Sequence, residues 1–310
     1  MGDARIQPTP VRIIEWPGFG RIWVKDESLC PTGTFKDRLS SRLEESLERT
    51  GLLTPETAIG SITLGNTLAS LASTFLRRPE EERPSVFGVF PAGFGARTIG
   101  PDTAGRSMRG ADLLARLERL GARVIEHPLE ERYLDGASMQ RLAEQVGVRF
   151  RQFVDVTNGI DAPAYRIILE EALPEIGPAP LDYVIVPVGA GILFQEAVQL
   201  LRERGHHAVV RGVSVLSGNS IADKLFGYYS PYYDDLRKRA VAQYAPGSSD
   251  RVELVDDGAI SEALGVLRAI GVDAEPSAAA AFAALSRLPA GSNVLVVNTG
   301  NGIPWGHGPR

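Results

Sequence analysis

Residues 25–38 read Lys-Asp-Glu-Ser-Leu-Cys-Pro-Thr-Gly-Thr-Phe-Lys-Asp-Arg, and this stretch sets the expectation for the fold. A short strand pattern at 21–25 leads into it, and a Pro-Thr-Gly-Thr turn occupies 31–34. A helical pattern then runs from 35 to about 50. A strand, a tight turn and a helix in that order predict one unit of an α/β fold.

Lys36 falls in the first turn of this predicted helix. Thr34, with Asp37 three residues later, has the form of a capping box and predicts the helix start, while Gly51 predicts its end. The positive end of the helix dipole disfavours an ammonium at Lys36. An unprotonated amine is what a Schiff-base lysine needs, and arginine could not replace it. The alternative for an isolated lysine is a solvated side chain on a helix face.

Strand, turn and helix patterns alternate along the rest of the chain. We expect strands at 58–64, 85–90, 122–125, 183–188, 208–215 and 293–297, and helices at 67–77, 108–120, 165–173, 193–203 and 277–288. This alternation indicates βαβ units and mainly parallel sheets covered on both faces. The predicted fold class is α/β, with two three-layer domains and a cleft between them.

The domain organisation follows from the same patterns. We expect an N-terminal α/β region at 1–152, in which 52–150 forms a smaller domain and the first segment crosses to the larger one. The larger α/β domain takes 153–310. A Gly- and Pro-rich segment at 91–105 and the segment at 217–250, with four tyrosines at 228, 229, 232 and 233, are the least regular. The second is a candidate lid or partner surface.

Composition excludes several classes of protein. The 310 residues carry a net charge of −5, which argues against a nucleic-acid binder. No stretch has the roughly 20 apolar residues of a bilayer span, and the start lacks a secretory signal pattern. Cys30 is the single cysteine, so a reducing cytoplasm is the expected location. The four histidines lack metal-ligand spacing, so no metal site is expected.

Three strand-to-helix turns are candidates for a ligand site, because ligands of open parallel sheets collect at the carboxyl ends of strands. They contain Lys36, Gly65-Asn66 and Gly189-Ala190-Gly191. The third turn directs backbone N–H groups toward a ligand at a helix N-terminus, an arrangement that suits a phosphate.

The stretch at 25–38 resembles the cofactor-lysine motif of pyridoxal-phosphate (PLP) enzymes of the tryptophan synthase β family, also called fold type II. It is closest to threonine synthase-like and cysteine synthase-like members. The resemblance implies that Lys36 bonds to pyridoxal 5′-phosphate as a Schiff base and afterwards acts as the catalytic base. It also implies a small amino-acid substrate, a homodimer, and neither a nucleic-acid nor a membrane partner.

Further matches occur in the family's order. Residues Thr63, Leu64, Gly65, Asn66 and Thr67 resemble the loop that binds the substrate carboxylate, and its Asn contacts the cofactor's 3′-oxygen. Gly189, Ala190, Gly191, Ile192 and Leu193 resemble the cofactor-binding phosphate loop. Ala274–Ala279 resembles the Glu-Pro segment of threonine synthases. Residues 298–302 resemble the segment whose threonine, here Thr299, faces the pyridine nitrogen.

The departures from the family pattern shape the expected reaction. Leu64 replaces a small hydroxyl residue, and Ala190 stands where many members have Gly or Asn. Ile303-Pro304-Trp305-Gly306 differs from the Leu-Lys-Asp-Pro of threonine synthases. These departures and the compact length favour a β-replacement synthase acting on a small amino acid with a β-leaving group. The alternatives are a PLP-dependent lyase, of threonine synthase or serine/threonine dehydratase type, and a catalytically idle binding or scaffold homologue.

Two other groups of residues invite a functional interpretation. Arg97, Arg106 and Arg109 surround the Gly-rich segment and either bind an anionic substrate group or are ordinary surface arginines. Cys30 is either a reactive thiol near the cofactor or a small packed residue.

Overall fold

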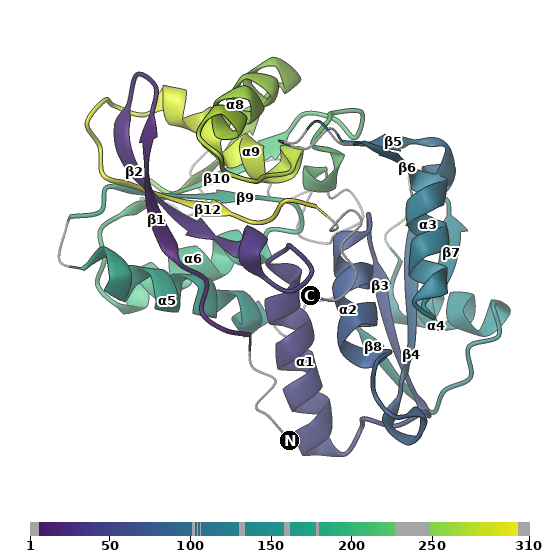
Figure 1. The fold of residues 1–310 in the computed structure, drawn as a ribbon. Helices are drawn as coiled ribbons and strands as arrows, with labels where there is room; N and C mark the ends of the chain where they lie inside the picture. Colours follow the sequence, from purple (N-terminus) through teal and green to yellow (C-terminus); the bar gives the residue numbers. More distant parts are fainter. Residues whose placement is uncertain are drawn as a thin grey trace.

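The computed structural model describes residues 6–100, 103, 105, 107–129, 134–157, 162–177, 180–226 and 249–302. Within these residues the chain forms two lobes, each built around a sheet with helices on its faces (Figure 1). The two sheets have six and four strands. All strand pairs in them are parallel except the one between the first two strands of the chain. The predicted α/β class with mainly parallel sheets is confirmed.

The six-stranded sheet combines the first strands of the chain with the last ones. Its order is β1 (Val11–Trp16), β2 (Gly20–Asp26), β12 (Val294–Asn298), β9 (Tyr183–Pro187), β10 (Val209–Val215) and β11 (Arg251–Val255). Helices α5 (Arg166–Ile176) and α6 (Ile192–Glu203) cover one face, and α8 (Asp257–Ala269) and α9 (Pro276–Ala283) cover the other. Val184 and Val186 pack toward α5 and α6, whereas Ile185 packs toward α8 and α9, as strand alternation requires.

The four-stranded sheet has the order β7 (Arg123–His127), β4 (Ser85–Pro91), β3 (Thr57–Ile62) and β8 (Gln152–Asp155). Ile59 and Val86 face α1 (Lys36–Thr50), α2 (Asn66–Phe75) and α3 (Gly110–Arg119). Ala58 and Phe87 face α4 (Gly136–Gln145). A short ribbon of β5 (Thr98–Ile99) and β6 (Met108–Arg109) extends from this lobe toward α8 and α9 (Figure 1).

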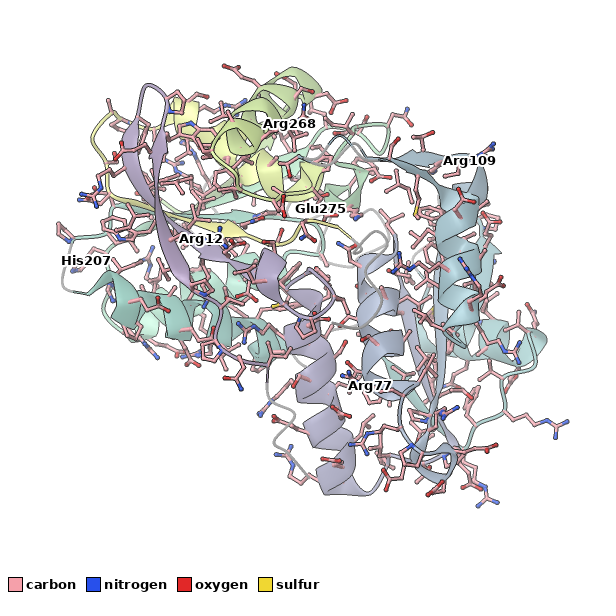
Figure 2. The ribbon with its side chains drawn as sticks, in the orientation of Figure 1. Arg12, Arg77, Arg109, His207, Arg268 and Glu275 are labelled. Carbon is pink, nitrogen blue, oxygen red and sulfur yellow. The ribbon has the colours of Figure 1, made fainter. Side chains whose placement is uncertain are left out.

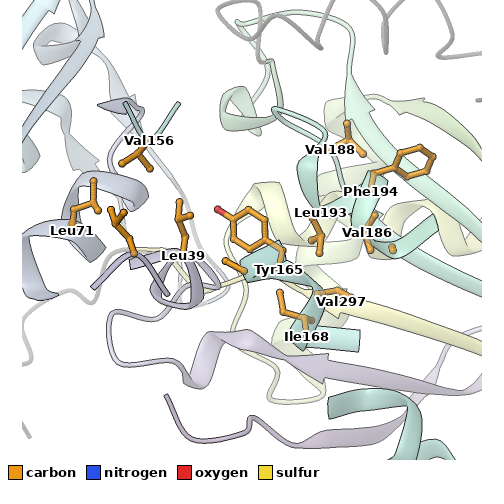
Figure 3. Close-up of a cluster of buried hydrophobic side chains, with 14 of the residues drawn as sticks. Leu39, Leu71, Val156, Tyr165, Ile168, Val186, Val188, Leu193, Phe194 and Val297 are labelled. Atoms are coloured by element: carbon orange, nitrogen blue, oxygen red, sulfur yellow. The ribbon is translucent and has the colours of Figure 1, made fainter. Parts of the chain in front are cut away.

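One hydrophobic cluster joins the two lobes. Leu39 and Leu71 belong to it from α1 and α2, and Val186 and Leu193 belong to it from β9 and α6. Figure 3 shows the Tyr165 ring between these two groups of side chains. The cluster fixes the turn before α1 relative to the turn before α6, because both helices contribute to one continuous core.

The sequence patterns located most, but not all, of these elements. Gly51 ends α1 in the left-handed conformation that its role as helix stop requires. Helices α4 and α8 and strands β1, β5, β6, β8 and β11 were not expected from the patterns, and the helix predicted from 108 begins at Gly110. The predicted domain boundary at 152/153 stays a prediction. The four tyrosines at 228–233, Arg106 and residues 303–306 lie outside the described residues.

Candidate active site

Lys36 is the first residue of α1, and a buried carboxylate holds the turn before it. The Asp37 carboxylate accepts hydrogen bonds from the Thr32 backbone N–H (2.6 Å), the Thr32 hydroxyl (2.7 Å) and the Ser70 hydroxyl (2.6 Å). The predicted capping box is therefore wrong, since Asp37 turns to Thr32 and Ser70 instead of reaching back to Thr34. The helix begins after Phe35 without a side-chain cap, although the Thr34 hydroxyl accepts a hydrogen bond from the Lys36 N–H at 3.4 Å.

Backbone contacts tie the Lys36 turn to the segment that follows β12. The Phe35 N–H donates to the Thr299 carbonyl at 3.0 Å, and the Asn301 N–H donates to the Gly33 carbonyl at 3.0 Å. The two segments lie so close together that a Cβ on Gly300 would be 2.6 Å from the Gly33 carbonyl oxygen. Lys36 and Thr299 therefore border the same cavity although 263 positions separate them in sequence (299 − 36).

This cavity, of about 140 Å³, opens between the two lobes. The Lys36 Nζ donates a hydrogen bond to the Tyr165 hydroxyl at 3.0 Å and lies 4.5 Å from the centre of the Phe35 ring. Thr63, Leu64, Asn66 and Thr67 line it from the start of α2. Gly65 is buried between them, and its N–H donates to the Thr63 hydroxyl at 2.9 Å.

The Gly189–Leu193 turn forms another wall of the cavity. Gly191 adopts a left-handed conformation (φ 88°) and precedes α6 without a side-chain cap. The first N–H groups of a helix lack partners within the helix and can bind an anion. A Cβ on Gly189 would lie 2.9 Å from the Lys224 carbonyl oxygen, so glycine is needed where these two segments touch.

A charged group that the sequence patterns did not indicate also lines the cavity. Lys224 donates a short hydrogen bond to Glu275 and a second one, at 3.0 Å, to the Asn66 side-chain oxygen. The Asn66 amide in turn donates to Glu275 at 2.9 Å. Glu275 was noted only as part of the Glu-Pro segment, and Lys224 and Tyr165 carried no sequence signal. Figure 2 shows Glu275 near the middle of the molecule, at the start of α9.

The other singled-out residues lie elsewhere. Arg97 forms a long ion pair with Asp223 (3.8 Å), whereas Arg109 is exposed at the outer edge of its lobe (Figure 2). Cys30 is buried, and burial together with the Glu27 carboxylate raises the pKa of its thiol far above the ordinary value. Burial and the nearby carboxylate therefore favour the protonated thiol, which is unreactive. Cys30 is not among the residues that line the cavity.

Fold and cavity together resemble pyridoxal-phosphate enzymes, and comparisons with known proteins identify the family. The model of the family described as "Pyridoxal-phosphate dependent enzyme" matches residues 92–300, more than half of the chain. The chain belongs to this family, and pyridoxal phosphate is its cofactor. The Lys36 turn lies before the matched range and carries the resemblance independently.

Individual relatives agree with this assignment. The chain is 28% identical to a cysteine synthase of Helicobacter pylori over 294 residues, which cover 89% of this chain and 85% of the relative. The fold is similar to the crystal structure of O-ureido-L-serine synthase, with a TM-score of 0.71 and 18% identity over 95% of this chain and 89% of that one. The O-acetylserine dependent cystathionine β-synthase of Helicobacter pylori gives a TM-score of 0.69 at 23% identity, over 98% of this chain and 96% of that one.

The donor groups around the cavity fit the cofactor. Lys36 offers an amine for an aldehyde, and the glycine turn before α6 offers N–H groups for a phosphate. The Thr299 hydroxyl could bond a ring nitrogen, and the Phe35 ring adds an apolar surface. Among the described residues, no helix is long and apolar enough to cross a membrane.

Proposed function

We propose that the chain catalyses β-replacement on a small amino acid that carries a leaving group on its β-carbon. The observation that carries the proposal is that one cavity gathers the Lys36 amine, the Gly189–Leu193 turn, Asn66 and Thr299. When bound, the cofactor supplies an electron sink for the carbon that loses its proton. The remaining chemistry falls to side chains and backbone groups of this chain.

Lys36 has two tasks in this proposal. Its amine would hold the cofactor through the aldehyde group, and as a free amine it would take the proton from the substrate's α-carbon. The released amine stays beside the carbon that it deprotonates, since α1 and the Tyr165 hydroxyl limit where it can move. The Gly189–Leu193 turn would bind the phosphate, and the Thr299 hydroxyl would hold the ring nitrogen. Asn66 would contact the 3′-oxygen, and residues 63–67 would receive the substrate carboxylate.

We prefer replacement to elimination because the similar proteins named above are synthases. The curated relative is a cysteine synthase, and similar folds include an O-ureido-L-serine synthase and a cystathionine β-synthase. In the net reaction the bond between the β-carbon and the leaving group breaks and a bond to the nucleophile forms. The proton of the nucleophile leaves with the departing group, so no oxidant or reductant is required. With the neutral Thr299 side chain at its ring nitrogen, the cofactor would be a milder electron sink. A milder sink suits loss of a group from the β-carbon.

Lys36→Ala tests the proposal, with Arg42→Ala on the exposed side of α1 as the control. The unchanged protein and the control should show the visible absorbance of a lysine-bound cofactor and form a new amino acid from O-acetyl-L-serine and sulfide. Lys36→Ala should lose both the absorbance and turnover. Full activity in Lys36→Ala would refute the role of this lysine.

The products distinguish the alternatives. Release of a 2-oxo acid and ammonia without a new amino acid would favour a lyase. No cofactor absorbance and no turnover with any amino acid would favour an idle binding homologue. A homodimer and a cytoplasmic location are also proposed, from the family resemblance and the single buried cysteine.

A further inference from the structure

A second cavity, of about 180 Å³, adjoins the cavity that Lys36 lines. The two cavities share Lys224, Glu275 and Ser277 in their linings, so these residues form the wall between them. The second cavity extends from this wall toward the ribbon of β5 and β6, where Ile99 and Met108 line it. It therefore gives a molecule other than the cofactor a place next to the proposed reaction site.

The wall between the cavities is a closed set of hydrogen bonds. Lys224 donates to both Glu275 and Asn66, and Asn66 donates to the second Glu275 oxygen. The Lys224 and Glu275 charges neutralise each other within this set. The wall is polar, but it offers no net charge to a ligand in the second cavity.

Asp223 gives the second cavity its net charge. Its carboxylate lines this cavity and not the first one. The nearest Arg97 nitrogen lies 3.8 Å away, beyond hydrogen-bond distance, and the Asp223 side chain is 27% exposed. Burial raises the pKa of Asp223, although Lys224 and Arg97 counteract that effect. A ligand cation within hydrogen-bond distance would compensate this carboxylate better than Arg97 does.

The rest of the lining is mixed: Asn219 and Ser220 are polar, and an apolar part suits a short carbon chain. Ile99, Met108, Ile221 and Pro276 present apolar surface beside Asp223. An inorganic nucleophile such as sulfide has no group for either the carboxylate or this surface. A molecule with an ammonium at one end and a short chain could contact both, and its other end would reach the wall.

We propose that the second cavity binds the nucleophilic second substrate, an organic molecule whose ammonium group is held by Asp223. This inference rests on the proposed β-replacement, because that reaction is what requires a second substrate. Asp223 is then a specificity-determining residue for the nucleophile. It has no role in binding the cofactor or the first amino acid.

Three thiols that differ in charge test this proposal. With O-acetyl-L-serine as the first substrate, kcat/KM is measured for cysteamine, 2-mercaptoethanol and 3-mercaptopropionate, and for sulfide. The variant is Asp223→Asn, and the control is Asp112→Asn on the exposed side of α3. Asp223→Asn should lower kcat/KM about ten- to hundredfold for cysteamine, the loss expected for one hydrogen bond between charged groups. The values for 2-mercaptoethanol and sulfide, and the KM of O-acetyl-L-serine, should stay unchanged. An equal loss for all four nucleophiles, or no loss for cysteamine, would overturn the proposal.

A binding measurement separates this inference from the proposed reaction. 2-(Dimethylamino)ethanol carries an ammonium but cannot condense with an aldehyde, so calorimetry on the cofactor-loaded protein reports the cavity alone. Binding that is present in the unchanged protein and lost in Asp223→Asn supports the site even if no turnover is found. Turnover with sulfide, together with no binding of this probe, would overturn the site while the β-replacement reaction stands.

Discussion

Gly300 shows how a single residue controls the geometry of the candidate site. A Cβ at this position would lie 2.6 Å from the Gly33 carbonyl oxygen and 3.1 Å from the Thr34 Cα. Both neighbours are backbone atoms of the turn that presents Lys36, so neither can move without displacing that turn. Glycine here allows the two segments to pair, and this pairing brings Lys36 and Thr299 to one cavity.

We therefore expect Gly300→Ala to lower the free energy of unfolding by roughly 1–3 kcal/mol, the usual cost of overpacking. It should also weaken cofactor binding, measured by titration of the visible absorbance. Gly265→Ala in α8 is the matched control, because nothing lies within 4 Å of the added Cβ. The control should raise stability by about 0.5–1 kcal/mol through helix propensity. Unchanged stability and cofactor affinity in Gly300→Ala would show that the turn is not tightly constrained.

At the scale of elements, a buried ionic network joins β2, α1 and α5. Glu27 accepts hydrogen bonds from Arg38, and Arg38 and Lys25 both pair with Glu171. Lys25 and Glu27 are fully buried, and the network contains two cations and two carboxylates, so removing one charge leaves one buried charge without compensation. The network fixes the helix that begins at Lys36 against the six-stranded sheet, which sets the orientation of the lysine.

Glu27 also makes stability depend on pH. Burial alone would raise its pKa, but Arg38, Thr9 and Lys25 outweigh burial and hold the pKa below the ordinary 4.5. The stability that Glu27 contributes is therefore full above that value and is lost as the pH falls through its folded-state pKa. Glu27→Gln should cost about 3–5 kcal/mol at neutral pH. The difference from the unchanged protein, measured by urea unfolding, should shrink as the pH falls below 4.5.

Glu45→Gln on the exposed side of α1 provides the comparison. Its partner Arg42 is half-exposed, so the change should cost less than about 1 kcal/mol at every pH. A Glu27→Gln cost that is equally small would show that the buried network contributes little to stability.

For the whole molecule, the candidate site draws on both lobes. Asn66 and Thr67 come from the lobe with four strands, and the Gly189–Leu193 turn and Thr299 come from the lobe with six. A ligand that contacts both lobes stabilises the folded state by mass action, by about 2.7 kcal/mol at a hundredfold excess over its Kd. Cofactor binding should therefore raise the thermal midpoint of the cofactor-free protein by several degrees.

Pyridoxal, which lacks the phosphate, separates the two parts of the site. It retains the aldehyde for Lys36 but has no group for the turn before α6. Scanning fluorimetry should show a smaller shift with pyridoxal than with pyridoxal phosphate at equal concentration. Equal shifts would mean that the Gly189–Leu193 turn does not bind the phosphate.

The sequence by itself determined the local units and the family. Turn residues and apolar patterns lie within about 15 positions of each other, so the strand, turn and helix around Lys36 were readable in advance. Three of the strands that the patterns missed, β1, β8 and β11, lie at the edges of the two large sheets. Edge strands are less completely buried, so their apolar pattern is weaker.

Only the tertiary structure decided which distant residues meet. The contact of Asn66 with Lys224 and Glu275 spans 158 and 209 positions, and strand order, not local pattern, creates it. The same holds for the contact of Tyr165 with Lys36, and for the position of Asp223 in the lining of the second cavity. The physical reason is that propensity and periodicity act between neighbours in the chain. The side chains that border a cavity are chosen by how the sheets pack.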